Sequence, residues 1–142
     1  MALQWTSALS VGVPEIDVQH QELFRRVDRL LDAMLHHDRS EAGRLLAFLR
    51  EFVVEHFGAE ERLMAELAYP GAEAHVQEHR RFGATLQAVD QAFQASGPTA
   101  AVVLQLEQQA VAWLRDHVYF TDVALGRFVQ AQRASAGGRA AC

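Results

Sequence analysis

Four stretches of this sequence repeat apolar residues at every third or fourth position, the spacing of one face of an α-helix. They cover about residues 17–37, 41–67, 72–95 and 99–120 and are rich in Ala, Leu, Glu, Gln and Arg, which favour helix. Pro14, Pro70 and Pro98 stand between them, where proline interrupts helices. The pattern predicts an all-α, up-down-up-down four-helix bundle with an N-terminal arm, followed by a short helix at about residues 122–132.

The composition fits one domain and argues against several kinds of partner. Half of the 142 residues are apolar, which is enough for one core. The net charge is −5 and no Lys/Arg cluster is present, so we expect no nucleic-acid partner. No apolar run reaches the roughly 20 residues of a membrane span and the N-terminus lacks signal-peptide features, so we expect no membrane insertion and a cytoplasmic location.

The C-terminus is expected to lie outside the folded unit. We assign residues 1–133 to the domain and 134–142, with two adjacent glycines, to a flexible tail. The single cysteine, Cys142, is the last residue, so neither an intrachain disulfide nor a cysteine metal site is expected. Gly58 and Gly83 interrupt good helices, and we expect another helix to approach closely at these positions.

Polar residues occupy inward positions on all four apolar stripes. Burying an imidazole or a carboxylate is costly unless the group is paired or bound to a metal. The residues concerned are His20, His56, Glu60, His75, His79 and His117. His56/Glu60 and His75/His79 are four residues apart, so each pair lies on one helix face, close enough to share an ion. Five histidines are more than one ion needs, which predicts a dinuclear metal site.

Asp122 is the expected second carboxylate, and its spacing from His117 carries a structural prediction. Five residues at 100° each place it about 140° away from the direction of His117 in a regular α-helix. If both bind metal, the fourth helix must end or distort between them. Thr121 would cap a new turn there.

The balance of ligands indicates the metal and its chemistry. Imidazole and carboxylate without thiolate suit iron, with manganese and zinc as alternatives. Five imidazoles, two bridging carboxylates and one bridging oxo or hydroxo group would fill all but one position of two octahedral ions. One small ligand could therefore bind end-on. Two carboxylates stabilise high-valent iron less than the four of oxygen-activating di-iron bundles, which favours reversible binding over O–O cleavage.

These residues resemble the bacterial hemerythrins over about residues 5–128. The resemblance rests on Trp5, Gly12, Ile16-Asp17-Val18-Gln19-His20, His56-Phe57-x-x-Glu60-Glu61, Met64, Tyr69-Pro70, His75-x-x-x-His79-x-x-Phe82 and Trp113-Leu114-x-x-His117-Val118-x-x-x-Asp122. Val118 stands where the family usually has isoleucine. The resemblance implies a non-haem di-iron bundle, with a bridging oxo or hydroxo group, that binds dioxygen reversibly for carriage, storage or delivery and is not an enzyme.

The same resemblance implies a division of the ligands. His75, His79 and His117 would hold one iron, His20 and His56 the other, and Glu60 and Asp122 would bridge them. The iron with two histidines would keep the open position. Phe24, one turn from His20, and Val118, beside His117, are expected to line the ligand space. Nitric oxide and azide-like anions are further candidate ligands, and a delivery or reductase protein is a candidate partner.

Three other functions use some of the same residues. A di-iron redox enzyme acting on peroxide or nitric oxide would need the same ligands, and a sensor would act through a separate partner because the chain leaves no room for an output domain. His75-Val76-Gln77-Glu78-His79 also matches the inverted zinc-protease motif. That motif leaves His20, His56, Glu60 and His117 without a purpose, and it places its catalytic base, Glu78, on a flank expected to face solvent.

Overall fold

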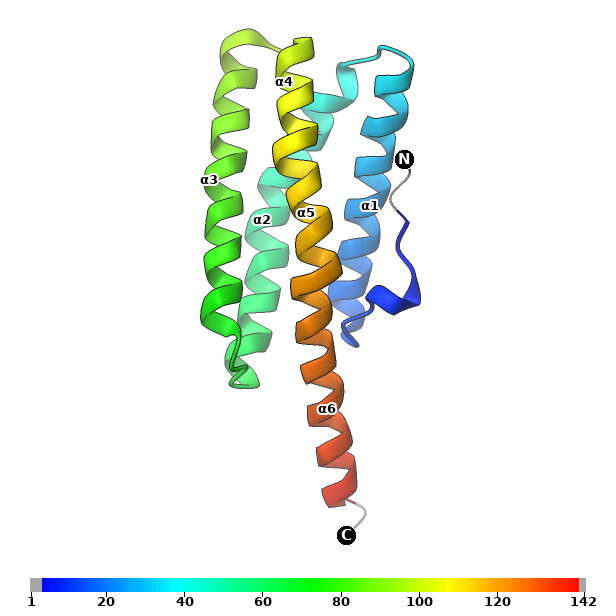
Figure 1. The fold of residues 1–142 in the computed structure, drawn as a ribbon, viewed down its shortest axis with the longest axis vertical. Coiled ribbons are helices and arrows are strands. Elements are labelled where there is room, and N and C mark those ends of the chain that lie inside the picture. The colour runs from blue at the N-terminus through cyan, green and yellow to red at the C-terminus, as the bar shows by residue number, and fades with distance from the viewer. Residues whose placement is uncertain (1–3, 141–142) are drawn as a thin grey trace.

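The computed structural model describes residues 4–140, with side chains as far as residue 136, and it is an all-α bundle (Figure 1). A single 3-10 turn, η1 (Ser7–Leu9), lies in the N-terminal arm. The first three long helices are α1 (Pro14–Leu35), α2 (Ser40–Glu66) and α3 (Ala72–Ser96). The up-down-up-down topology predicted from the sequence is confirmed.

The fourth helix is one continuous rod built from five segments. These are α4 (Ala100–Gln105), η2 (Leu106–Val111), α5 (Ala112–Asp116), η3 (His117–Asp122) and α6 (Val123–Ala140). Both η2 and η3 are π-helical, so each takes in a wider turn than the α-helix around it. The expected irregularity between His117 and Asp122 is present, as a π turn inside an unbroken helix.

The last helix is longer than the sequence analysis predicted. It follows η3 directly and runs to Ala140, whereas a separate helix at about residues 122–132 was expected. Ala and Arg favour helix at most of the added positions, 133–140, and the two glycines alone do not end it. Figure 1 shows α6 projecting beyond the end of the other helices. Cys142 lies outside the described residues.

Helix ends follow local backbone chemistry. Pro14 is the first residue of α1, where its missing N–H costs nothing. After α2, Ala68 takes a left-handed conformation (φ 49°), and the Tyr69 N–H then donates to the carbonyl of Met64. Thr99 precedes α4 and its hydroxyl accepts from the Val102 N–H, capping the helix.

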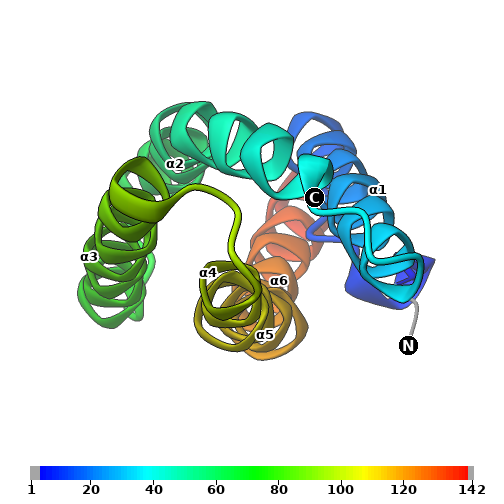
Figure 2. The same cartoon turned by 90° about the horizontal axis from the view of Figure 1, so that it is seen from above.

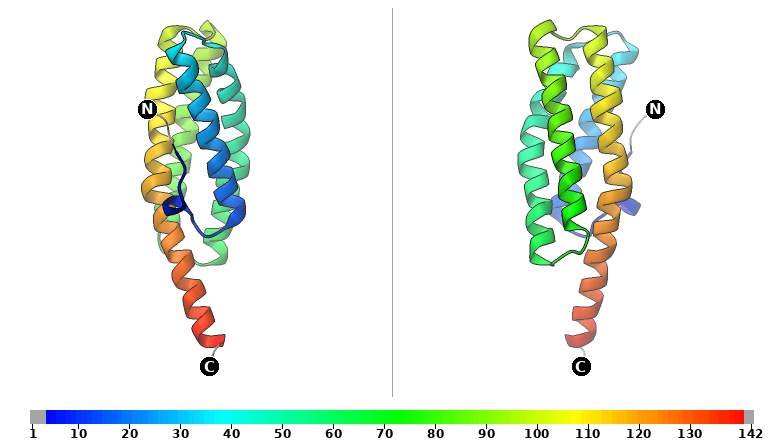
Figure 3. Two further views of the ribbon diagram at one scale, coloured as in Figure 1. Left: turned by 90° about the vertical axis from the view of Figure 1, so that its right-hand side faces the viewer. Right: turned by 60° about the vertical axis from the view of Figure 1, so that its left-hand side comes forward.

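The helices enclose a core with the rod on the open side. Seen from above, α2 stands between α1 and α3, and α4 to α6 face it (Figure 2). The N-terminal arm runs beside α1 and crosses to the rod (Figure 3). There a Cβ on Gly126 would lie 2.7 Å from the Cα of Val11, so only glycine allows this contact. The arm thus covers the seam between α1 and the rod.

Two apolar clusters fill the interior. The larger contains Leu23, Leu30, Leu49, Phe82 and Leu106, and the smaller contains Met64, Leu125 and Val129. On α2 and the rod, Glu60 and Asp122 fall between the two clusters in sequence, and His56 and His117 adjoin the last residues of the larger one. They therefore lie in a layer with apolar packing above and below.

The expectation that another helix approaches closely at Gly58 and Gly83 is wrong. A Cβ on Gly83 would meet nothing within 4 Å, and one on Gly58 would meet only the Arg62 side chain of its own helix. No other helix requires glycine at these positions. Across the described residues, no helix combines the length and the apolar character needed to cross a bilayer.

Candidate metal centre

The structure brings all seven sequence-predicted ligands into one layer of the bundle. One ligand comes from α1, and α2, α3 and η3 supply two each. All seven are buried: His20, His56, Glu60, His75, His79, His117 and Asp122. Within the described part of the chain, they are the only buried polar or charged side chains. Every polar group that the core contains therefore belongs to this layer.

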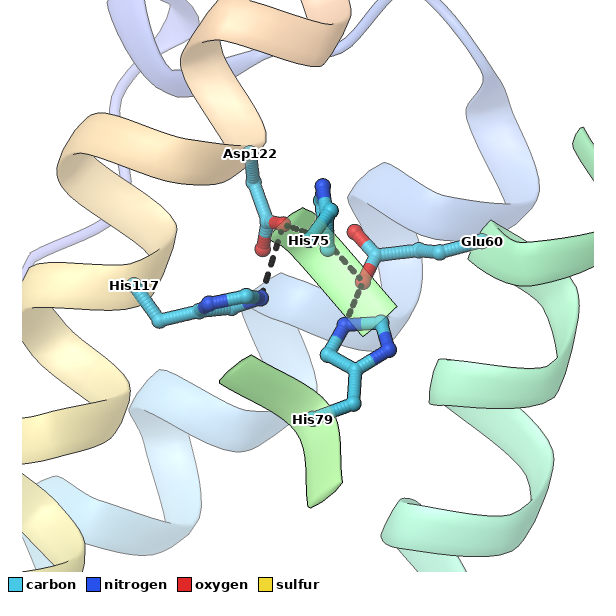
Figure 4. Close-up of side chains that lie close together, drawn as sticks. All are labelled: Glu60, His75, His79, His117 and Asp122. Atoms are coloured by element: carbon cyan, nitrogen blue, oxygen red, sulfur yellow. Dashed lines mark hydrogen bonds and ion pairs between the residues drawn. The ribbon is translucent and has the colours of Figure 1, made fainter. Parts of the chain in front are cut away.

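All five imidazoles turn the same nitrogen, Nε2, toward the two carboxylates. The Asp122 Oδ1 lies 3.1 Å from Nε2 of both His75 and His117, and its Oδ2 lies 3.0 Å from Nε2 of His20. The Glu60 Oε1 lies 3.1 Å from Nε2 of His79 and 3.6 Å from that of His56. Figure 4 shows three of these imidazoles around the two carboxylates.

The π turn places Asp122 in this layer. A hydrogen bond from residue i+5 to residue i widens the turn, so side chains five apart come onto one face. The sequence analysis expected Thr121 to cap a new turn, but in the structure it lies inside the π turn and caps nothing. Its hydroxyl lies 3.0 Å from both carboxylate oxygens of Glu78 on α3, which ties the π turn to the neighbouring helix.

The ligand atoms form two overlapping groups that could each hold a metal ion. One contains Glu60, His75, His79, His117 and Asp122, and the other contains His20, His56, Glu60 and Asp122. The atoms of each group lie within 4.8 Å of one another. Both carboxylates belong to both groups, which is the arrangement that two bridging ligands would give.

Burial and mutual charge shift the pKa values in this layer. Burial, and then the charge of Asp122, raise the pKa of Glu60 well above its usual range. Burial would also raise the pKa of Asp122, but the charge of His117 and the nearby imidazoles of His20 and His75 outweigh it and lower that pKa. The pKa values of the two buried carboxyls are therefore shifted in opposite directions, because two buried like charges repel.

Two of the imidazoles are held in their neutral, metal-binding form. Burial, followed by the charges of His75 and His117, lowers the pKa of His79 to about 3. Burial and the charge of His20 lower the pKa of His56 well below its usual value. Asp122 has the opposite effect on His117, whose pKa is raised despite burial. Neutral imidazole is the form that binds metal.

The unpaired polar atoms of the layer fit a pair of bound cations. Buried atoms without a hydrogen-bond partner include Nε2 of His20, His56, His75 and His117, Oε2 of Glu60 and both oxygens of Asp122. Each such atom costs about 1–3 kcal/mol when left unsatisfied. All these atoms face the centre of the layer, where a metal ion would satisfy them.

Aromatic rings fix the orientation of three imidazoles. Phe52 stacks on His56 with 4.5 Å between ring centroids, Phe57 on His79 at 3.8 Å, and Trp113 on His117 at 4.7 Å. Phe52 and Trp113 each lie one turn before the histidine they cover. These contacts restrict rotation of the rings and keep Nε2 directed inward.

The two residues expected to line the ligand space are both buried. Phe24 is 3% exposed and Val118 is 1% exposed, and both belong to the larger apolar cluster. The Phe24 ring meets Tyr119 edge-on with 6.1 Å between centroids. Their contact with a bound ligand remains a prediction.

The sequence analysis did not predict the contacts that three side chains make behind the imidazoles. Gln19 Oε1 lies 2.6 Å from Nδ1 of His56, and Glu61 Oε2 lies 3.1 Å from Nδ1 of His79. Glu78 Oε1 lies 3.5 Å from Nδ1 of His117, although Glu78 was expected to face solvent. Helix periodicity does not reveal these contacts, because each partner lies on a flank of one helix and meets a histidine of another.

The sequence is similar to that of known proteins over most of its length. Residues 11–127 match the model of the hemerythrin HHE cation binding domain. A bacteriohemerythrin of Methylococcus capsulatus is 32% identical over 128 residues, covering 89% of this chain and 96% of its own length. One of Stenotrophomonas maltophilia is 28% identical over 129 residues, covering 91% and 82%. A hemerythrin-like protein of Naegleria gruberi is 38% identical over 78 residues, covering 55% and 60%.

Proposed function

Since this chain belongs to the hemerythrin family, a group of cation-binding domains, we propose that it binds dioxygen reversibly at a non-haem di-iron centre. The observation that carries the proposal is the pair of overlapping ligand groups that share Glu60 and Asp122. A shared pair of carboxylates holds two ions close enough to act together on one small molecule.

We assign the two iron positions from the groups themselves. His75, His79 and His117 would hold one iron, His20 and His56 the other, and Glu60 and Asp122 would bridge them beside an oxo or hydroxo group. The first position would thus receive three histidines and the second only two, which would leave room for a further ligand at the second. Dioxygen would bind at the iron held by His20 and His56.

The protein supplies position, charge balance and a dry environment to this centre. When bound in the ferrous state, two irons can together supply the two electrons that dioxygen binding draws on. Five imidazoles and only two carboxylates keep the negative charge of the ligand set low, which disfavours higher oxidation states. Phe24 and Val118 would exclude water from the ligand space.

The polar content of the core favours binding over turnover. An enzyme that cleaves an O–O bond needs an acid or a base to move protons at the site. Among the described residues, the seven ligands are the only buried polar side chains, so none remains for that task. We therefore propose a carrier, storage or delivery protein rather than a redox enzyme acting on peroxide or nitric oxide.

A cycle of optical spectra on the iron-loaded protein tests the proposal. The reduced protein should gain visible absorption in air and lose it again under inert gas, returning dioxygen unchanged. Catalytic consumption of dioxygen, or rapid turnover of peroxide or nitric oxide, would instead support the redox-enzyme alternative. A cytoplasmic location and a delivery or reductase partner remain predictions of the same proposal.

A further inference from the structure

The five imidazoles differ in what stands behind them, at Nδ1. Within the described residues, His20, His75 and His117 have no hydrogen-bond partner at this atom. The Glu61 carboxylate lies at hydrogen-bond distance from His79, an amide lies behind His56, and the Glu78 carboxylate stands 3.5 Å from His117, too far for a hydrogen bond. The three-histidine group thus has carboxylates near two of its imidazoles, whereas the two-histidine group has only an amide.

A carboxylate and an amide have different effects on a neutral imidazole. An ionised carboxylate only accepts hydrogen bonds, so it draws the imidazole proton to Nδ1 and leaves the Nε2 lone pair free. An amide can accept through its oxygen or donate through its nitrogen. Glu61 therefore favours the metal-binding tautomer of His79, and the nearby negative charge of Glu78 favours the same tautomer of His117, whereas Gln19 can turn over and accommodate either tautomer of His56.

The charge of these partners adds to the effect. Partners that accept from the outer nitrogen make an imidazole more basic toward its metal, and removing them typically weakens metal binding by about 10–100-fold. Both negative partners stand behind the three-histidine group, and a neutral one stands behind the other. Glu61 is 40% exposed and Glu78 is 34% exposed, so water reduces the effect toward the lower end of that range.

A hollow in the protein surface reaches the Gln19 amide. This hollow of about 250 Å³ between α1 and α2 is lined by Gln19 and His56 together with Phe48 and Phe52. Water in this hollow can hydrogen-bond to the Gln19 amide in either orientation. The outer side of the two-histidine group is therefore less firmly held than the positions behind His79 and His117.

We propose that Glu61, Glu78 and Gln19 are positioning residues that make the two metal positions unequal. The carboxylates prepare His79 and His117 to bind, and Gln19 leaves the His20/His56 position weaker and quicker to release its ion. The inference rests on the proposed dinuclear centre and adds the order in which its ions bind and leave. The position proposed for dioxygen is then also the one that exchanges metal first.

Metal release from the loaded full-length protein tests this order. The chain is loaded with Co²⁺, a chelator is added in excess, and the loss of cobalt absorption is followed. The unsubstituted protein should lose its two ions in a fast and a slow phase. Gln19→Glu should slow the fast phase by about tenfold, and Glu61→Gln should speed the slow phase by about tenfold. Glu78→Gln should speed the slow phase by less, because Glu78 acts on His117 through its charge and not through a hydrogen bond.

Matched substitutions on α3 control for net charge. Gln77 and Glu73 are exposed, so Gln77→Glu and Glu73→Gln repeat the charge changes away from the imidazoles and should alter neither phase. If Glu78→Gln weakens the fold enough to release both ions together, Gln19→Glu decides the question, because it leaves the three-histidine group untouched. Release rates in Gln19→Glu that match those in Gln77→Glu would overturn the inference.

Proton NMR of the Zn²⁺-loaded protein gives a second readout. An imidazole Nδ1 proton shared with a carboxylate resonates further downfield than one shared with an amide. The Nδ1 proton of His56 should therefore move downfield in Gln19→Glu, and that of His79 should move upfield in Glu61→Gln. Binding of one ion per chain would reject the dinuclear centre itself, whereas two ions with unaltered phases and resonances would reject only the roles of these three residues.

Discussion

His117 and Asp122 lie five residues apart, yet the π turn between them brings Nε2 and Oδ1 to 3.1 Å. A regular α-helix would direct the two side chains about 140° apart. One widened turn thus supplies a carboxylate to both ligand groups without interrupting the fourth helix. Thr121, bonded to Glu78, holds that turn against α3.

Removing the shared carboxylate should affect metal content more than removing a histidine. Asp122→Asn weakens both groups, so we expect well under one iron per chain. His56→Gln alters only one group, so close to one iron should remain. Iron analysis of the purified proteins, with the exposed Asp116→Asn as control, checks this graded loss. Equal iron content in Asp122→Asn and His56→Gln would contradict the shared role.

Removing the metal should loosen the bundle. The buried atoms that face the centre would then lack partners, and each unsatisfied group costs about 1–3 kcal/mol of stability. Metal binding therefore contributes to the free energy of folding. We expect a chelator to lower the Tm by several degrees. In Asp122→Asn the same chelator should have little effect, and identical melting of loaded and metal-free wild-type protein would show that the ligands are satisfied without metal.

The metal-free protein should lose stability as the pH falls below about 6. His56 and His79 have pKa values lowered by burial, so below 6.5 the unfolded chain takes up protons that the folded chain does not. Each of these groups then costs about 1.4 kcal/mol per pH unit. Glu60 has a raised pKa and therefore changes the free energy of unfolding in the opposite direction, down to its ordinary pKa of 4.5. It offsets one of the two histidines, so stability still falls as the pH falls.

Urea unfolding of the metal-free protein at two pH values below 6 measures this slope. His79→Gln removes one of the two groups and should make the slope shallower. His36→Gln changes an exposed histidine and should leave it unchanged. A free energy of unfolding that rises as the pH falls would mean that Glu60 dominates the linkage.

A polar side chain at position 118 should shorten the life of the dioxygen-binding form. Val118 is buried beside His117, and Val118→Ser would admit water to a space that we expect to be dry. The variant should keep near-normal iron content but lose dioxygen-binding capacity faster in air. Val111→Ser, at a similarly buried position in η2, is the control. Equal rates of loss in the two variants would remove Val118 from the ligand space.

Two glycine-to-alanine substitutions should have opposite effects on stability. Gly126→Ala places a methyl group against the Val11 backbone and should destabilise the fold by about 1–3 kcal/mol. Gly83→Ala meets nothing within 4 Å and should stabilise α3 by up to about 1 kcal/mol. Thermal or urea unfolding of both variants measures the difference, which would vanish if the arm did not pack on α6.

The inward histidines were predictable because the 100° period of a helix sorts residues by face. That period also predicted that the helix must distort before Asp122, although not that the distortion is a π turn. The second π turn, Leu106–Val111, had no comparable signal, since no pair of required ligands spans it.

The contacts between helices were the part that periodicity could not supply. Glu78 has a flank position on α3, and only the packing of α3 against η3 brings it to His117 and Thr121. Gln19 reaches His56 across the α1–α2 interface in the same way. The length of α6 was missed because high helix propensity continues past the last apolar position of the stripe.

The contact between Val11 and Gly126 also bears on when the molecule can be completed in the cell. The arm is synthesised before any of the long helices, and the glycine that receives it is made only after α1, α2 and α3. His117 and Asp122 lie in the same late segment, so an unfinished chain has neither its seam covered nor either ligand group complete. Neither ligand group is therefore complete until residue 122 has been made, and a chain truncated before that residue would lack a ligand of both groups.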